Sequence, residues 1–207
     1  MNESSNDGMN TDNSISSKET INSSISFERD IPLSEDKKKC IIKSVINNLK
    51  EIIKENIQNN QMPYVIKDKF YYSHVPGISI DDYINRIFTS TKMNISSLIM
   101  SIIYIDRFCE FNRYVLCMNN IHRILLTACL LSIKFNEDIN ISSKYYAEVA
   151  GIPVYDLNNL EIYLCVKLKF SLFVSCDIYQ KYYEYFCKSY YSDYNKEKND
   201  KKKNVYI

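Results

Sequence analysis

The chain has 207 residues, of which 45% are hydrophobic and 25% are charged, and its formal net charge is +1. These values are typical of one globular domain, and the near-neutral charge disfavours a protein that binds nucleic acid through a basic field. Only 3 glycines and 4 prolines leave few turn residues for an all-β fold, so the composition favours an all-α fold.

The N-terminal part predicts a polar tail followed by an amphipathic helix and a connection. Residues 1–33 are mostly Ser, Asn, Asp, Glu and Thr without apolar periodicity, so we expect a disordered tail. Ser34 then precedes two acids, as an N-cap does, and predicts a helix over about 35–58. The helix and the proline-containing connection after it form a segment over 34–78. The apolar face of the helix consists of Ile42, Val45, Ile46, Leu49, Ile52 and Ile53.

The opposite face of this helix is basic. It carries Lys37, Lys38, Lys39, Lys43, Lys50 and Lys54. A basic amphipathic helix is compatible with a membrane surface or a calmodulin-like partner. We prefer the commoner arrangement, a solvated face on a helix that packs against the domain, and therefore expect no peripheral membrane contact.

From residue 79 onward, helical patterns follow one another closely. The expected helices begin with a short one at Asp81 and then cover about 94–112, 119–136, 143–150 and 153–168. The 119–136 helix is apolar nearly all round, which places it in the middle of a bundle. Gly151 is suited to a left-handed helix end, and Pro153 to a first helical turn.

The C-terminal part predicts one more helix and a tail. Residues 176–190 carry an aromatic stripe, and residues 191–207 are basic and expected to be disordered.

The cysteines and the N-terminus indicate the cellular compartment. Seven cysteines without a C-x-x-C pair indicate reduced thiols, and no signal core or long apolar run is visible. We therefore expect a cytoplasmic or nuclear protein, or both, without a transmembrane segment.

Two charged residues interrupt apolar helical stripes. Lys134 ends the 119–136 helix, where its stem leans back over leucines. Taken alone, a lysine in a final turn is explained by the helix dipole. Glu161 shares a helical face with Leu157 and Leu164, and a carboxylate there costs several kcal/mol unless it is paired or near water. The pattern predicts that Lys134 and Glu161 lie together at the rim of an apolar patch, the kind of surface that binds a protein partner.

Four motifs around these residues resemble the cyclin box. They are "YIDRF" (104–108), "NIHRILLTACLLSIKFNED" (120–138), "KYYAEVAGI" (144–152) and "LNNLEIYLCVKLKFSLFVS" (157–175). The resemblance covers about residues 79–175 in uninterrupted order. Within the family, it is strongest to the small single-box P/U-type cyclins of the phosphate-regulation kind. We therefore expect a five-helix box with one additional helix on each side and no second box.

The resemblance implies a regulatory subunit that binds a cyclin-dependent protein kinase as a heterodimer. Cyclins of this kind activate the kinase by holding its αC helix in the active position. In the family, the residues matching Lys134 and Glu161 hydrogen-bond the backbone that flanks that helix. By the same match, the apolar kinase-binding surface consists of Leu131, Phe135, Cys165, Phe170 and Leu172.

The sequence departs from cell-cycle cyclins at one motif. Their Met-Arg-Ala-Ile-Leu docking patch is replaced here by "NRIFT" (85–89), which does not favour substrate recruitment through that patch. We expect Arg86 to pair with Asp106 in the core, which is a structural role.

An enzyme is disfavoured by the residues themselves. His74 and His122 are the only histidines, and we find no phosphate loop and no ligand cluster with metal spacing. We expect no catalytic residue, metal, cofactor or small-molecule substrate. A nucleophilic cysteine near His122 is the one catalytic alternative that the sequence leaves open. The functional alternative is a cyclin-fold adaptor that binds a non-kinase protein, a peptide or nucleic acid in transcription.

Overall fold

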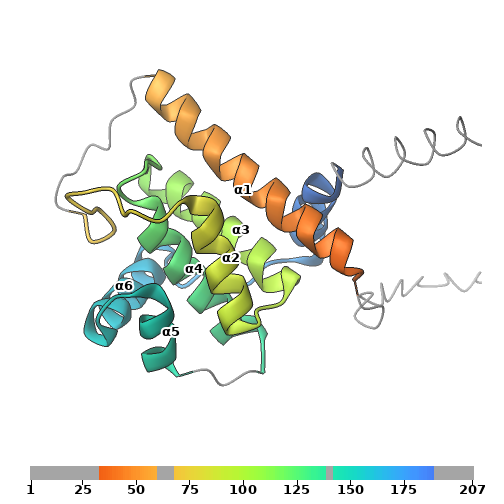
Figure 1. The fold of residues 1–207 in the computed structure, drawn as a ribbon. Coiled ribbons are helices and arrows are strands. Elements are labelled where there is room, and N and C mark those ends of the chain that lie inside the picture. The colour runs from red at the N-terminus through yellow and green to blue at the C-terminus, as the bar shows by residue number, and fades with distance from the viewer. Residues whose placement is uncertain (1–32, 60–67, 139–141, 189–207) are drawn as a thin grey trace, which may run out of the picture. The chain divides into compact units, whose positions relative to one another are not determined.

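The computed structural model describes residues 33–59, 68–138 and 142–188. All of them belong to one compact unit that begins at Leu33. They form helices and connecting segments, with no strand in these three ranges (Figure 1). The helices are α1 (Glu35–Gln58), α2 (Ile80–Thr91), α3 (Ile95–Asn112), α4 (Ile121–Asn136), α5 (Ser143–Ala150) and α6 (Val154–Lys167). A further helix covers 176–188, where the description ends. The predicted all-α fold is confirmed, whereas the two expected tails lie outside the described residues.

Serine side chains begin three of these helices. Ser34 Oγ accepts the backbone N–H of Lys37 at 3.3 Å and begins α1. Ser79 and Ser142 cap α2 and α5 in the same way. At the other end of α5, Gly151 has φ 71°, the left-handed conformation predicted for it. Pro153 is the N-cap of α6 and lies just outside the first turn, one residue earlier than expected.

The core is built around α4, which packs against α2, α3 and α6. Twelve of its residues, from Ile121 to Ile133 without Arg123, are buried. Only the last turn, Lys134 to Asn136, is exposed. The all-round apolar pattern therefore correctly predicted a central helix. Because nearly all the rest of α4 is buried, its C-terminal end is the part that is accessible to a partner.

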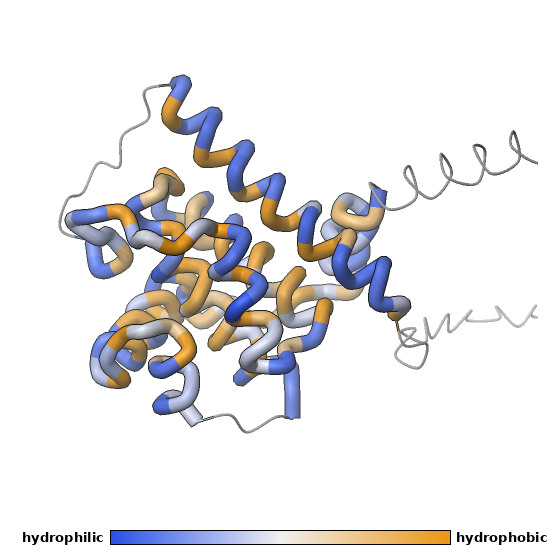
Figure 2. The backbone as a smooth tube through the Cα atoms, in the orientation of Figure 1, coloured by the Kyte–Doolittle hydropathy of each residue, from blue (hydrophilic) through white to orange (hydrophobic). Residues whose placement is uncertain are grey.

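α1 packs against α2 and α3, although it precedes the box predicted from the sequence. Apolar and polar residues alternate along it (Figure 2). Its apolar residues Val45 and Leu49 are 0% and 1% exposed. The apolar face is thus buried in the fold, as expected for a packed helix with a solvated basic face. In the ranges that the structure describes, no helix is both long and apolar enough to cross a bilayer.

The last helix, 176–188, is tied to α3 and α1 by tyrosine hydroxyls. Tyr182 donates to Oδ2 of Asp106 on α3 at 2.8 Å, and Tyr185 accepts from the Asn48 side chain on α1 at 3.1 Å. The predicted pair of Arg86 and Asp106 does not form. Arg86 is exposed, and none of the ion pairs among the described residues joins it to Asp106. The expected structural role of Arg86 is therefore wrong, and Tyr182 takes the place assigned to it.

Candidate partner-binding site

The candidate site lies where the last turn of α4 meets α6. The Lys134 ammonium is 2.8 Å from both carboxylate oxygens of Glu161 and 3.4 Å from the hydroxyl of Ser143. The two charged residues that break apolar stripes are thus brought together, as the sequence predicted. The side chain of Lys134 is 37% exposed and that of Glu161 is 18% exposed, so the pair remains open to water on one side.

This ion pair contributes little to the stability of the fold. Partly exposed pairs of this kind are worth about 0.2–1 kcal/mol, because water and salt screen them. The contact between α4 and α6 is instead stabilised by buried leucines of α6, Leu157, Leu160 and Leu164. Because the pair lies at an accessible edge and adds little stability, it is a candidate for contact with a partner protein.

Apolar side chains continue from the pair along the surface. Cys165 lies one turn after Glu161, and the charges of Glu161 and Lys134 both act on its thiol, whose pKa is raised, first by burial. Phe135 and Phe170 are 51% and 69% exposed. The carbonyl of Cys165 accepts the N–H of Phe170 at 2.9 Å, which joins this phenylalanine to the same end of α6.

The remaining two predicted surface residues are less accessible. Leu172 is half-buried. Leu131 is only 4% exposed, so a partner would have to displace other side chains to contact it. The accessible surface therefore consists of Lys134, Phe135, Glu161, Cys165, Phe170 and Leu172, which we call the α4–α6 surface.

Three exposed apolar residues beside this surface were not predicted. Phe173 is 75% exposed, and Ile162 and Val166 on α6 are 63% and 54% exposed. In the sequence, Ile162 and Val166 are spaced four apart, as core residues of a helix also are. Such spacing does not distinguish a buried face from an exposed one, so the sequence carried no clear signal for them.

The backbone after α6 takes an uncommon conformation. Lys169 and Phe170 have φ values of 52° and 55°, both in the left-handed region. Side chains with a β-carbon adopt this region at a cost of roughly 1–2 kcal/mol per residue. Two hydrogen bonds close the end of α6, from Lys169 N–H to the carbonyl of Val166 at 3.0 Å and from Phe170 N–H to that of Cys165.

Side chains of α3 hold the segment that follows. One guanidinium nitrogen of Arg107 donates to the carbonyls of Ser171 and Phe173, each at 2.9 Å. The hydroxyl of Tyr104 donates to the carbonyl between them, that of Leu172, at 2.9 Å. Both residues belong to the "YIDRF" motif, in which the sequence had suggested a role for Asp106 alone.

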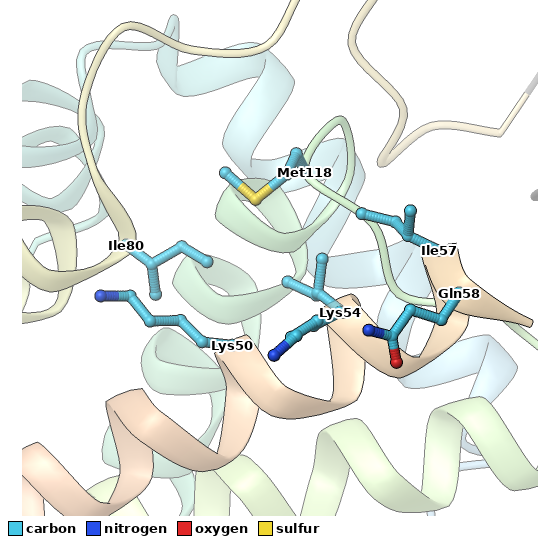
Figure 3. A pocket seen from close by; sticks show the side chains of 7 residues that line it. Lys50, Lys54, Ile57, Gln58, Ile80 and Met118 are labelled. Carbon is cyan, nitrogen blue, oxygen red and sulfur yellow. The ribbon is translucent and has the colours of Figure 1, made fainter.

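A second surface feature is a shallow apolar hollow of about 360 Å³ beside α1. Its lining includes Ile57, Ile80 and Met118, with the lysines 50 and 54 at its edge (Figure 3). Lys50 is already paired with the carboxylate of Asp81. Since it is small and open, we regard the hollow as a weaker candidate than the α4–α6 surface.

The environment of His122 addresses the open question of a cysteine nucleophile. Its Nε2 lies 3.0 Å from the carbonyl of Ile78, and burial lowers its pKa. Burial raises the pKa of the thiols of Cys109 and Cys129 to about 12, which keeps them protonated at neutral pH.

No group of three or more metal-ligating side chains occurs in residues 33–59, 68–138 and 142–188.

Comparison with known proteins places these features in a family. The family model for cyclins matches residues 7–172. Cyclin-U2-1 of Arabidopsis thaliana is 36% identical over 109 residues, which are 52% of this chain and 49% of that protein. Cyclin-P3-1 of Oryza sativa subsp. japonica is 30% identical over 120 residues, 56% of this chain and 51% of that protein.

A fungal relative extends the similarity. PHO85 cyclin-like protein psl1 of Schizosaccharomyces pombe is 32% identical over 142 residues, which are 66% of this chain and 58% of that protein. The alignments thus span about half the length of the relatives. The match to the family model and the all-helical fold around α4 agree with the resemblance found in the sequence motifs. The chain belongs to the cyclin family.

Proposed function

We propose that this cyclin binds a cyclin-dependent protein kinase through the α4–α6 surface and activates it. The observation that carries the proposal is the pair of Lys134 and Glu161, joined at 2.8 Å beside the exposed rings of Phe135 and Phe170. Apolar side chains flanked by fixed charges favour a protein partner that needs both affinity and a defined register. The similarity to a PHO85 cyclin-like protein also supports a kinase partner.

The cyclin would act on the kinase by conformational preference. Phosphoryl transfer requires the αC glutamate of the kinase to pair with a strand lysine, so the position of the αC helix controls activity. A partner that binds only the active position shifts the equilibrium toward it. A shift from 1:99 to 99:1 requires about 10⁴-fold preferential binding, or roughly 5.5 kcal/mol. No group of the cyclin needs to contact ATP, which agrees with a regulatory and non-catalytic subunit.

The test is copurification of the kinase with the full chain from its native cell. Lys134→Ala and Glu161→Ala each leave a charge without its partner and remove a hydrogen-bonding group from the rim. We expect each variant to lose at least tenfold in kinase affinity while circular dichroism stays that of the wild type.

A matched ion pair provides the control. Lys50 on α1 and Asp81 on α2 form a more exposed pair that lies outside the α4–α6 surface. Lys50→Ala and Asp81→Ala should retain the kinase. If all four variants bind the kinase equally well, the assignment of the surface is wrong. If the wild type captures only a non-kinase protein through the same two residues, the adaptor alternative replaces kinase activation.

A further inference from the structure

Three successive carbonyl groups after α6 are held by one helix. The carbonyls of Ser171, Leu172 and Phe173 accept hydrogen bonds from Arg107, Tyr104 and again Arg107, all at 2.9 Å. Successive carbonyls of an extended segment point in different directions, so bonding all three restrains the segment about its own axis. A single hydrogen bond would fix its distance from α3 and leave it free to rotate.

The backbone just before these carbonyls needs such support. Lys169 and Phe170 are two consecutive non-glycine residues in the left-handed region. Conformations of this kind persist only where the surroundings determine them. Within the segment itself, the bonds are local, such as Leu172 N–H to the carbonyl of Phe170 at 2.9 Å. Hydrogen bonds from the side chains of Arg107 and Tyr104 connect residues 171–173 to α3.

The segment displays two aromatic rings that the core does not orient. Phe170 is 69% exposed and Phe173 is 75% exposed. Since rings that remain in water gain little from burial, the hydrophobic effect does not select their direction in the free chain. Their direction is set by the backbone to which they are attached, and hence by the bonds that hold it.

We propose that Arg107 is a positioning residue for partner binding, assisted by Tyr104. By holding residues 171–173 against α3, it fixes the backbone in the one shape that presents Phe170 and Phe173 on the α4–α6 surface. Preorganised interface residues bind more tightly because they lose less freedom on association. The inference deepens the proposed function and rests on it, since the partner is the kinase that the surface would bind.

A matched arginine separates positioning from stability. Arg123 on α4 also donates to one backbone carbonyl of a connecting segment, that of Lys69 at 2.8 Å, and its guanidinium lies 3.9 Å from the centre of the Tyr72 ring. It belongs to the first turn of α4, three turns from Lys134. Arg107→Ala and Arg123→Ala therefore each remove a guanidinium that bonds a connecting segment, but only Arg107→Ala acts on the segment that carries Phe170.

Two measurements are made on the full chain and on both variants. The first is hydrogen–deuterium exchange of the free protein, in which Arg107→Ala should accelerate exchange in residues 169–175 by tenfold or more and leave α4 and α6 protected. The second is affinity for the copurified kinase, which should fall at least tenfold for Arg107→Ala and less than twofold for Arg123→Ala, with similar melting temperatures for the two variants.

Each result decides the inference. Unchanged exchange in residues 169–175 overturns it, whatever happens to kinase affinity. Faster local exchange with an affinity equal to that of Arg123→Ala also overturns it, because the fixed backbone would then not matter for binding. If the wild type binds no kinase, the proposed function fails, and the exchange measurement alone decides whether Arg107 fixes this segment.

Discussion

Asp106 is a half-buried carboxylate in the "YIDRF" motif of α3, and its hydrogen-bond donor is the hydroxyl of Tyr182. Burial raises its pKa above the usual range, and the nearby charge of Glu110 adds a smaller effect in the same direction. The bond from Tyr182 works against this rise but does not cancel it. The ionised carboxylate is therefore less favourable in the folded protein than in the unfolded chain, where water solvates it.

Replacing this charge should stabilise the protein in a pH-dependent way. Because the pKa of Asp106 is higher in the folded state, the folded chain binds more protons, and stability falls as the pH rises through the folded pKa. Asp106→Asn keeps an oxygen for Tyr182 and removes this loss. We expect the variant to gain melting temperature over the wild type at pH 7 and little at pH 4.

Asp81 serves as the control for this experiment, because its pKa is shifted in the opposite direction to that of Asp106. Its pKa is lowered by the hydrogen bond from Lys50, so its contribution is present above the unfolded pKa and is lost as the pH falls. Asp81→Asn should therefore lower the melting temperature slightly at pH 7 and have no effect at low pH. A gain for Asp81→Asn, or a loss for Asp106→Asn at pH 7, would contradict this account of the two carboxylates.

At single residues, the sequence predicted best where a side chain broke a pattern. Lys134 and Glu161 stood out because each interrupts an apolar stripe, and the structure joins them. Arg86 interrupts no apolar stripe, and its exposed position on α2 separates it from Asp106. The exposure of Phe173 had no signal in the sequence either, because the backbone there is bonded to residues 64 or more positions earlier in the chain.

At the scale of helices, the apolar periodicity predicted the ends of α3, α4 and α5 at 112, 136 and 150, and it placed the starts of α3 and α4 one and two residues early. Serines cap α1, α2 and α5, because their side chains accept the first free N–H groups, but only the cap of α1 was identified from the sequence. The ends of α2 and α3 are formed by Lys92 and Arg113, with φ values of 51° and 49°. A basic residue gives no sequence signal for the left-handed conformation, which glycine adopts at no steric cost.

Lys92 therefore offers a stabilising substitution. Its side chain is exposed, so Lys92→Gly should relieve the left-handed strain without removing a packed group, and we expect the free energy of unfolding to rise by about 1 kcal/mol. Lys54→Gly, at an exposed position inside α1, should instead lower it by about 1 kcal/mol. Denaturant unfolding of both variants checks the prediction, and equal destabilisation by both would refute it.

At the scale of the whole molecule, α1 is part of the same folded unit as the box. The sequence identified its apolar face but not the surface that buries it. An apolar stripe shows which side of a helix is buried, but not which other helix covers that side. Packing on α2 and α3 means that α1 and the α4–α6 surface share one core through α3, which also contacts α4 and α6.

A core substitution in α1 should therefore destabilise the entire domain. Leu49 is 1% exposed, and Leu49→Ala should lower the free energy of unfolding by about 2–5 kcal/mol. Ile57, in the same helix, is 61% exposed, and Ile57→Ala should change it by less than about 0.5 kcal/mol. The expected result is a single cooperative transition that moves as a whole, so an independent second transition for α1 would show that it folds separately.

The contact between Lys134 and Glu161 exists before any second protein arrives. Two long side chains have thus already lost part of their rotamer entropy, and the carboxylate oxygens of Glu161 retain lone pairs beyond their bonds to this ammonium. A second chain that docks here adds bonds to a formed pair and does not have to order it. Association should then proceed at the rate of a nearly rigid encounter, and differences in the lifetime of the complex, more than in encounter rate, should distinguish one partner from another.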